Sequence, residues 1–306
     1  KKHHKEIVKT EIKKYQKELD LEIALKGLQE EDLTDEEYLE EVQKIIKCNE
    51  EVETDEVIGE KEIIVSDVDK DAGMLYKSDK EKMFGYNTSV ICDNNNYILT
   101  VDTNGSNVHD SVSFYQSFEN LIKHFNISQI DYFVGDAAYL TPHICKTLID
   151  LEMIPAMPYT RKGYRKDYFK KYEFLYDEYN DIYICPNEKD LIPTGINKDG
   201  YIVYKACEKD CANCPLKDKC TKSKYKQILR HVWEGYKEMV NDYRHHEDVK
   251  EIYKQRPQHI ERVFADGKTK YGLRKTYFRT KERVHRELTL LFACMNLKKF
   301  ALHHYA

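Results

Sequence analysis

The sequence contains no run that approaches the ~20 consecutive apolar residues of a membrane-spanning helix. It also lacks an apolar segment at its start, where it reads Lys-Lys-His-His, so no secretory signal pattern is present. Internal repeats are absent as well. These absences exclude a membrane-spanning protein and predict a cytoplasmic one, in which the nine cysteines serve as thiols or metal ligands rather than as disulfides.

A large excess of one charge is also absent, since the formal net charge is only −5 over 306 residues. The total therefore argues neither for nor against a nucleic-acid partner. The distribution is uneven: residues 1–65 are acidic, residues 250–306 are basic, and residues 161–166 form a second basic patch. This asymmetry predicts an acidic arm and a basic working surface, with solvated helix faces as the alternative.

The first fifty residues have a helical pattern, because apolar residues recur every three or four positions from residue 4 to residue 50. Thr34, which three acidic residues follow, predicts the N-cap of a second helix. Two polar helices joined across residues 27–32 predict an antiparallel hairpin. The charged residues 49–63, which include no aromatic side chain, predict a linker.

Beyond residue 64 strands and helices alternate, which is typical of an α/β protein. Residues 160–230 interrupt this order and are rich in Tyr, Lys and Cys, so we interpret them as an insertion. The expected domains are the arm and linker at 1–63, the first part of the core at 64–159, the insertion at 160–230 and the C-terminal helices of the core at 231–306. The predicted strands are 84–92, 97–102, 130–136, 153–157, 182–184 and 201–204, and the predicted helices are 111–125 (capped by Asp110), 142–151, 233–265 and 281–304.

Two acidic residues are candidates for a divalent-metal site. Asp136 ends an apolar strand after Gly135, which allows close approach, and Glu261 lies on a predicted helix far along the chain. Mg²⁺ prefers hard oxygen ligands, and two such ions held by carboxylates can neutralise a phosphate during phosphoryl transfer. A strand-end Asp and a helical Glu that converge would suit this chemistry. Taken alone, each residue also fits a plainer role, as a capping Asp and a solvated Glu.

Five motifs in order resemble those of the DDE transposases of bacterial insertion sequences, most closely the insertion-sequence 1182 group. The resemblance runs from about Ser66 to the C-terminus. The motifs are Asn107-Val108-His109-Asp110, Gly135-Asp136-Ala137-Ala138-Tyr139, the helical pattern of Tyr253, Arg256, Glu261 and Lys268, the segment Phe264-Ala265-Asp266-Gly267-Lys268, and Met295-Asn296-Leu297-Lys298-Lys299.

The resemblance implies an RNase H-like α/β core with a Cys-rich insertion and an N-terminal helical hairpin. It implies Mg²⁺-dependent (or Mn²⁺-dependent) DNA cleavage and strand transfer, a form of DNA recombination, by a homodimer on paired transposon ends. Asp136 would be the second catalytic acid and Glu261 the third, both as metal ligands. Arg256 and Lys268 would contact DNA phosphates near the cut. Tyr253 would position the terminal nucleotides, with packing as its alternative role.

The chain departs from this family at the first catalytic Asp, which relatives carry on the first strand of the sheet in an Asp-Gly-Thr-Lys-like motif. No such motif occurs in residues 1–306, so we expect the chain to begin just inside the helical hairpin that follows that strand. Asp67 and Asp69 are possible substitutes. Two alternatives to an active transposase stay open: a catalytically incomplete remnant that binds DNA or a partner, and a zinc-dependent structural protein.

Four cysteines within fourteen residues form a candidate structural Zn²⁺ site. Cys207, Cys211, Cys214 and Cys220 have the spacing Cys-x3-Cys-x2-Cys-x5-Cys, and thiolates suit tetrahedral Zn²⁺. Cys185 could lie near them. Zinc would stabilise an insertion that has little core of its own, and a loop of reduced thiols is the alternative.

Basic and aromatic residues are interleaved between the last two predicted helices. Arg274 and Lys275 are candidate DNA contacts, because Lys and Arg neutralise phosphates and aromatic rings stack on bases. Neighbouring residues of these kinds are Tyr271, Tyr277, Phe278, Arg279, Lys281, Arg283 and Arg286. A solvated helix start is the alternative. No helix-turn-helix pattern is visible, so we expect another part of the protein to recognise the end sequence.

Overall fold

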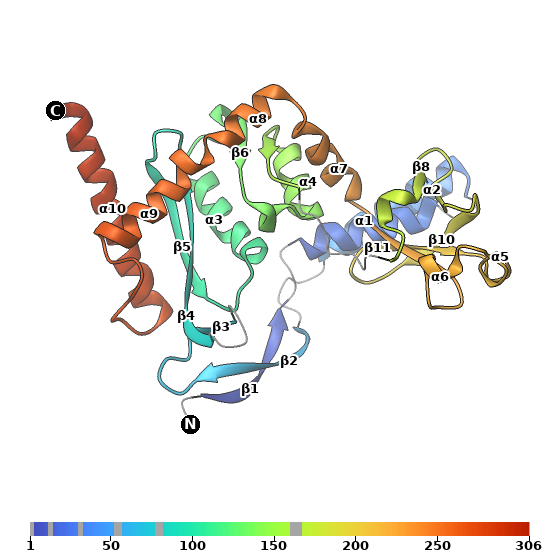
Figure 1. Ribbon diagram of the computed structural model, residues 1–306, viewed down its shortest axis with the longest axis horizontal. Helices are drawn as coiled ribbons and strands as arrows, with labels where there is room; N and C mark the ends of the chain where they lie inside the picture. The colour runs from blue at the N-terminus through green and yellow to red at the C-terminus, as the bar shows by residue number, and fades with distance from the viewer. Residues whose placement is uncertain are drawn as a thin grey trace. The chain divides into compact units, whose positions relative to one another are not determined.

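The computed structural model of the protein describes residues 3–11, 15–29, 33–51, 57–76, 82–159 and 167–305 (Figure 1). The contacts within the chain divide it into two compact units. Unit 1 consists of Lys1–Ile12, Glu56–Tyr159 and Lys237–Ala306, and unit 2 consists of Lys13–Asp55 and Thr160–Tyr236. Each unit is therefore assembled from segments that are far apart in the sequence.

Unit 1 combines α-helices with antiparallel and parallel strand pairs. Strands β1 and β2 form an antiparallel ribbon, β3, β4 and β5 form an antiparallel sheet in that order, and β6 pairs with β7 in parallel. The elements of this unit, with η for short 3-10 helices, are β1 (His3–Glu11), β2 (Val57–Ser66), β3 (Gly73–Tyr76), β4 (Lys82–Cys92), β5 (Ile98–Gly105), α3 (Asp110–His124), η1 (Ile127–Gln129), β6 (Tyr132–Val134), η2 (Ala137–Tyr139), α4 (Pro142–Asp150), β7 (Ile154–Ala156), α8 (Glu247–Lys254), η4 (Arg256–Gln258), α9 (Ile260–Lys270) and α10 (Lys281–Tyr305).

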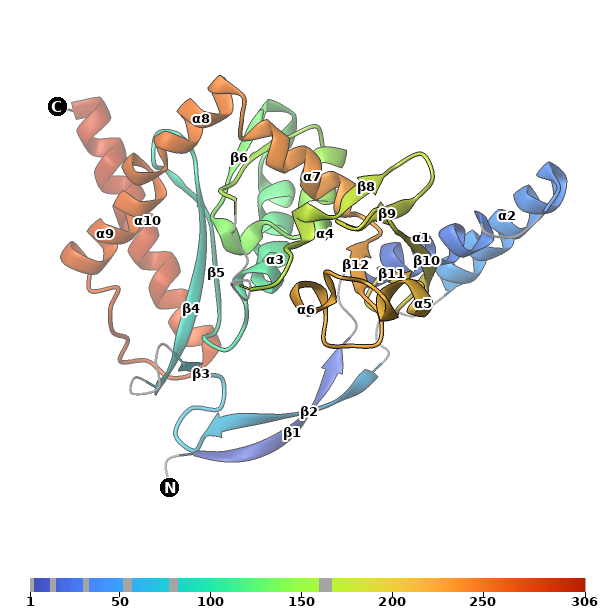
Figure 2. The same cartoon turned by 45° about the vertical axis from the view of Figure 1, so that its right-hand side comes forward.

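The long helix α10 lies along β5 and closes one side of the core of unit 1 (Figures 1 and 2). Asn296 fixes the register of this contact, because its side-chain oxygen accepts from the Ile98 amide at 2.9 Å and its side-chain nitrogen donates to the Ile98 carbonyl at 2.8 Å. The contact also buries apolar side chains of α9, so it holds α9 against the sheet. The buried residues of this cluster are Ile98, Val263, Val284, Leu288 and Phe292.

Most of the elements predicted for the core are confirmed. The cap of α3 is an exception, since His109 rather than Asp110 occupies the N-cap position, where its Nδ1 accepts from the Ser111 amide at 3.2 Å. The confirmed strands are 84–92, 97–102, 130–136 and 153–157, observed as β4, β5, β6 and β7, and the confirmed helices are 111–125, 142–151 and 281–304, observed as α3, α4 and α10.

The helix predicted from residue 4 is wrong at its start, and the linker predicted at 49–63 is wrong at its end. Residues 3–11 form β1, which pairs antiparallel with β2 from His3 opposite Ser66 to Thr10 opposite Gly59. Both segments contain adjacent β-branched residues, which favour strands. The pairing partner lies about fifty residues away in the sequence, so the spacing of apolar residues within either segment could not indicate it.

The continuous helix predicted at 233–265 is also wrong, because the chain breaks twice within it. It runs as α7 (Glu234–Tyr243), which crosses the boundary between the units, then α8 and α9. The second break contains Pro257 in η4, and proline cannot donate the backbone hydrogen bond of a continuing helix. This break places Arg256 ahead of α9 and Glu261 in its first turn.

Unit 2 combines α-helices with an antiparallel sheet that has the strand order β12-β11-β10-β9-β8. The strands predicted at 182–184 and 201–204 are confirmed as β9 and β11. Of the predicted turn at 27–32, residues 27–29 belong to α1, and residues 30–32 lie outside the described residues. The elements are α1 (Gln16–Gln29), α2 (Asp35–Glu51), η3 (Lys171–Glu173), β8 (Leu175–Asp177), β9 (Ile182–Ile184), β10 (Asp190–Ile196), β11 (Tyr201–Ala206), α5 (Glu208–Ala212), α6 (Lys217–Cys220) and β12 (Gln227–His231).

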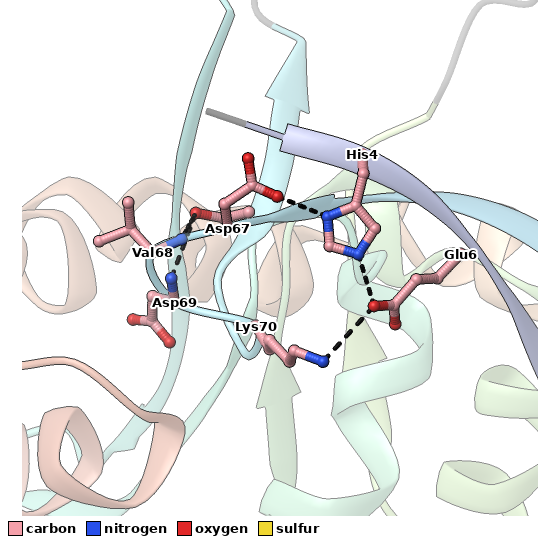
Figure 3. A network of polar contacts seen from close by, with 7 residues as sticks. His4, Glu6, Asp67, Val68, Asp69 and Lys70 are labelled. Carbon is pink, nitrogen blue, oxygen red and sulfur yellow. Dashed lines mark hydrogen bonds and ion pairs between the residues drawn. The ribbon is translucent and has the colours of Figure 1, made fainter. Parts of the chain in front are cut away.

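A polar cluster ties β1 to the turn that follows β2 (Figure 3). The Nδ1 atom of His4 lies 2.5 Å from Asp67 Oδ1, and its Nε2 atom lies 2.6 Å from Glu6 Oε1. Lys70 approaches the same Glu6 oxygen at 3.5 Å. The hydrogen bonds to Glu6 and Asp67 raise the pKa of His4 above its ordinary value. His4 therefore links the two strands of the ribbon most firmly when it is protonated.

We expect the contacts of His4 with Glu6 and Asp67 to weaken as the pH rises. Since the folded-state pKa of His4 is raised above about 6.5, its contribution is fully present below that value and is lost as the pH rises through the folded-state pKa. Glu6→Gln should move the pKa of His4 back toward its ordinary value, as followed by NMR titration of the imidazole ring. An unchanged pKa in this variant would contradict the role given to Glu6.

Candidate active site

Asp136 lies just beyond the carboxyl end of β6. Its Oδ1 accepts a hydrogen bond from the Ala138 amide at 2.8 Å, so the side chain caps η2. A side chain at residue 135 would be crowded, because a Cβ there would lie 3.3 Å from the ring of Phe133 and 3.4 Å from the ring of Tyr139. The capping role expected for an isolated Asp is thus present, and it leaves Asp136 half-buried at the end of a strand.

Charged and polar residues from several elements influence the phenol of Tyr139. Burial raises the pKa of Tyr139 to about 12, and the negative charges of Asp110 and Asp136 add to the rise. The positive charge of Arg256 and a hydrogen bond with Ser89 oppose it. These four residues lie on α3, at the end of β6, in η4 and on β4, so residues far apart in the sequence affect the pKa of Tyr139.

Glu261 is connected to Arg256 by an ion pair. The guanidinium Nη1 of Arg256 lies 2.5 Å from Glu261 Oε1, with the Arg256 side chain 23% exposed and the Glu261 side chain 51% exposed. The segment is anchored to the turn between β4 and β5, because His259 Nδ1 lies 2.8 Å from Asn96 Oδ1 and Asn96 Nδ2 donates to the Gln258 carbonyl at 3.2 Å. The start of α9 is therefore held in a fixed place on the sheet.

Asp136 and Glu261 carry the type of donor atom that a divalent cation prefers, but they are not arranged as a metal site. Carboxylate oxygens are the ligands that Mg²⁺ prefers. In the part of the chain that the structure describes, no group of three or more His, Cys, Asp or Glu side chains is placed to hold a metal ion. The Asp136 carboxylate bonds to a backbone amide and that of Glu261 to a guanidinium. A cation would therefore compete with Arg256 for the Glu261 carboxylate.

The remaining predicted DNA contacts are spread over the same helices. Tyr253 is half-buried on α8. Lys268 is exposed on α9, two turns after Glu261 and therefore on the same face of the helix. Arg274 and Lys275 are exposed between α9 and α10. The basic patch at 161–166 lies outside the described residues.

The two possible substitutes for a first catalytic Asp have structural partners. Asp67 bonds to His4 in the ribbon clasp. Asp69 accepts the Tyr86 hydroxyl at 2.7 Å and the Thr280 amide at 3.3 Å, next to the start of α10. An aspartate at a helix N-terminus is favourable there because it faces the positive end of the helix dipole. Asp69 thus joins α10 to the turn after β2.

Asp110 and Tyr139 lie near the site, although no role there was predicted for them from the sequence. Asp110 was expected only to cap a helix, but it accepts a hydrogen bond from Asn87 Nδ2 at 2.5 Å and lies near Tyr139. Both residues belong to motifs that carry the family resemblance. That membership was the available signal, while the convergence of these motifs depends on tertiary structure.

The thiols of unit 2 gather around Cys220. Burial raises the pKa of Cys220, Lys226 lowers it, and Cys211, Cys185 and Cys214 raise it further. Cys185 sits in a tight turn in which its sulfur accepts from the Lys189 amide at 3.4 Å. Cys207 is exposed at the start of α5. Three of the four cysteines predicted to bind zinc, Cys211, Cys214 and Cys220, therefore lie in one electrostatic group with Cys185.

Comparison with known families gives a match in the C-terminal part of the chain, which carries Glu261. Residues 184–301 match the transposase DDE domain. The matched span contains the predicted site residues Arg256, Glu261 and Lys268, but it begins after Asp136. It therefore supports a DDE transposase through the C-terminal part of the site. Such a domain implies an RNase H-like fold, a DNA substrate and, in general, dependence on a divalent metal.

Neither the curated proteins nor the solved structures yielded a match to this chain. None of the helices in the described ranges combines the length and the apolar character that a bilayer crossing requires.

Proposed function

We propose that the protein is the catalytic core of a DDE transposase of the insertion-sequence 1182 group, which cuts DNA and transfers strands at the ends of the element. The observation that supports this most strongly is the bond between Arg256 and Glu261, which lies within the residues that match a transposase DDE domain. Asp136, at the end of β6, belongs to the same compact unit as these two residues.

Each residue of the site has a proposed task. Asp136 and Glu261 hold the cation, Mg²⁺ or Mn²⁺. When bound, the cation supplies charge neutralisation at the phosphate and orients the attacking oxygen. Arg256 leaves Glu261 and donates to a phosphate oxygen, which a guanidinium binds as well as a carboxylate. Lys268 contacts a neighbouring phosphate, and Tyr253 positions the terminal nucleotides.

The proposal assigns the first catalytic Asp of the family to a segment other than residues 66–71. Asp67 bonds to His4, and Asp69 bonds to Tyr86 and to Thr280 at the start of α10. Moving either aspartate into the site would break those contacts. The active assembly is proposed to be a homodimer on paired ends, acting on DNA in the cytoplasm.

Cleavage of DNA that carries both ends of the element tests this proposal. In the presence of Mg²⁺ the protein should cut at the boundary of each end once a segment that carries the first catalytic Asp is supplied, whereas residues 1–306 alone should not cut, and removal of the metal with a chelator should stop the reaction. With that segment present, tight binding of the ends without cleavage under any divalent metal would contradict the proposal and would fit the catalytically incomplete remnant instead.

Structural zinc in unit 2 is a further part of the proposal. The thiols around Cys220 are of the soft kind that suits Zn²⁺, although no described group is arranged as a metal site. We expect about one zinc per chain by elemental analysis of the purified protein, lost in Cys220→Ser and kept in Cys294→Ser, because Cys294 lies on α10 in unit 1. Absence of zinc from a purified protein whose thiols can be titrated would contradict the proposed zinc site.

A further inference from the structure

The loop between α9 and α10, residues 271–280, displays aromatic rings to solvent. The Tyr277 side chain is 93% exposed and that of Phe278 is 51% exposed. Aromatic side chains are large apolar surfaces that proteins usually bury at least in part. Two adjacent rings on one exposed loop therefore indicate a surface that binds a partner.

The same loop is held firmly to unit 1 on both sides of these rings. Leu273 packs against the buried cluster under α10, and its amide donates to the Gly267 carbonyl at 3.0 Å. The Thr276 hydroxyl donates to Glu287 of α10 and accepts from the Phe278 amide at 3.1 Å. Thr280 is tied to Asp69 through its amide. A ring presented from an anchored loop loses little conformational freedom when it binds.

Three positive side chains flank the rings, while the carboxylates that touch the loop, Glu287 and Asp69, bond to Thr276 and Thr280. Arg274, Lys275 and Arg279 are exposed. None of the three forms an ion pair with a carboxylate among the residues that the structure describes. Free cations beside exposed rings match a nucleic acid strand, whose phosphates neutralise the cations while its bases stack on the rings.

We propose that the loop at 271–280 binds unpaired nucleotides at a DNA end, with a base stacked on Tyr277 and a second aromatic surface offered by Phe278. The proposal rests on the proposed function and names the form of its DNA substrate. Inside a duplex the faces of the bases are covered by their neighbours, and only the edges are accessible in the grooves. An exposed ring gains a stacking partner on unpaired bases and, to a smaller extent, on the terminal base pair of a duplex, whereas the three cations bind duplex phosphates equally well.

The test compares binding of the protein to a blunt duplex and to the same duplex with a short unpaired 3′ tail. Tyr277→Ala should weaken binding of the tailed DNA roughly tenfold or more, since one stacked base contributes on that scale, and should affect the blunt duplex much less, because only its terminal base pairs offer a base face. Tyr277→Phe keeps the ring and should keep the affinity. Lys275→Ala should weaken binding of both DNAs and reduce the salt dependence.

Tyr179 provides a matched control, because its side chain is 96% exposed and its loop neighbours Asp177, Glu178 and Asp181 are acidic. Tyr179→Ala should change neither affinity. Equal effects of Tyr277→Ala on both DNAs, or no effect on the tailed DNA, would overturn the inference while leaving the proposed function intact. A tail preference that depends on Tyr277, in a protein that cleaves no DNA with any metal, would uphold the inference and overturn the proposed function.

Discussion

Asp136→Asn and Glu261→Gln should each lower metal-dependent DNA cleavage by on the order of a thousandfold. A carboxylate that holds a catalytic cation contributes several kcal/mol of transition-state stabilisation, and each 1.36 kcal/mol corresponds to about tenfold in rate. Both changes remove a charge and keep the shape. Asn also caps helices well, so the hydrogen bond to the Ala138 amide can persist. Single-turnover cleavage of DNA ends with saturating protein measures the effect.

Glu251→Gln is the matched control for these variants, because Glu251 is an exposed glutamate on α8 that has no part in the site. It should cleave at the rate of the unchanged protein. DNA affinity measured without metal should be similar in all three variants, which separates loss of chemistry from loss of binding. Full activity in either Asp136→Asn or Glu261→Gln would remove that residue from the catalytic role.

Leu288→Ala should destabilise unit 1 by about 2–5 kcal/mol, the usual cost of truncating a buried leucine. Leu288 is 7% exposed and packs with Ile98 and Val263 under α10. The cavity would loosen the contact that holds α9, and with it Glu261, against the sheet. Denaturant unfolding measures the change in the free energy of unfolding.

Leu290→Ala makes the same chemical change two residues further along α10, where the side chain is 67% exposed. Its effect on the free energy of unfolding should stay within about 0.5 kcal/mol. Because residue type and helix are the same, a comparable loss in both variants would show that the packing of α10 on β5 does not determine the stability of this unit.

The elements that sequence patterns predicted well are those stabilised by nearby residues. Strands β4 and β5 are joined by a turn of Asp and Asn residues, and α3 and α10 have long apolar faces. Strands β1 and β2 were missed because they are stabilised by each other across an interval that contains two helices. The break before α9 was marked by Pro257, but the surrounding helical pattern outweighed it in the prediction.

The candidate site shows a similar limit. Motif resemblance selected Asp136, Arg256 and Glu261, and the bond between Arg256 and Glu261 brings two of them together. Neither spacing nor composition could indicate that Asp136 and Arg256 would both affect the pKa of Tyr139, because this depends on how β6, η2 and η4 fold. The cysteine spacing likewise predicted the set Cys207, Cys211, Cys214 and Cys220, while the influence of Cys185 on Cys220 depends on the folding of unit 2.

The position of Mn²⁺ in crystals of the protein with a DNA end tests the central claim most directly, through anomalous scattering. The account predicts an ion bonded at about 2.1 Å to a carboxylate oxygen of both Asp136 and Glu261, with Arg256 moved from Glu261 to a phosphate. It would be contradicted by crystals in which DNA is bound, Arg256 still pairs with Glu261, and no ion lies within bonding distance of either acid.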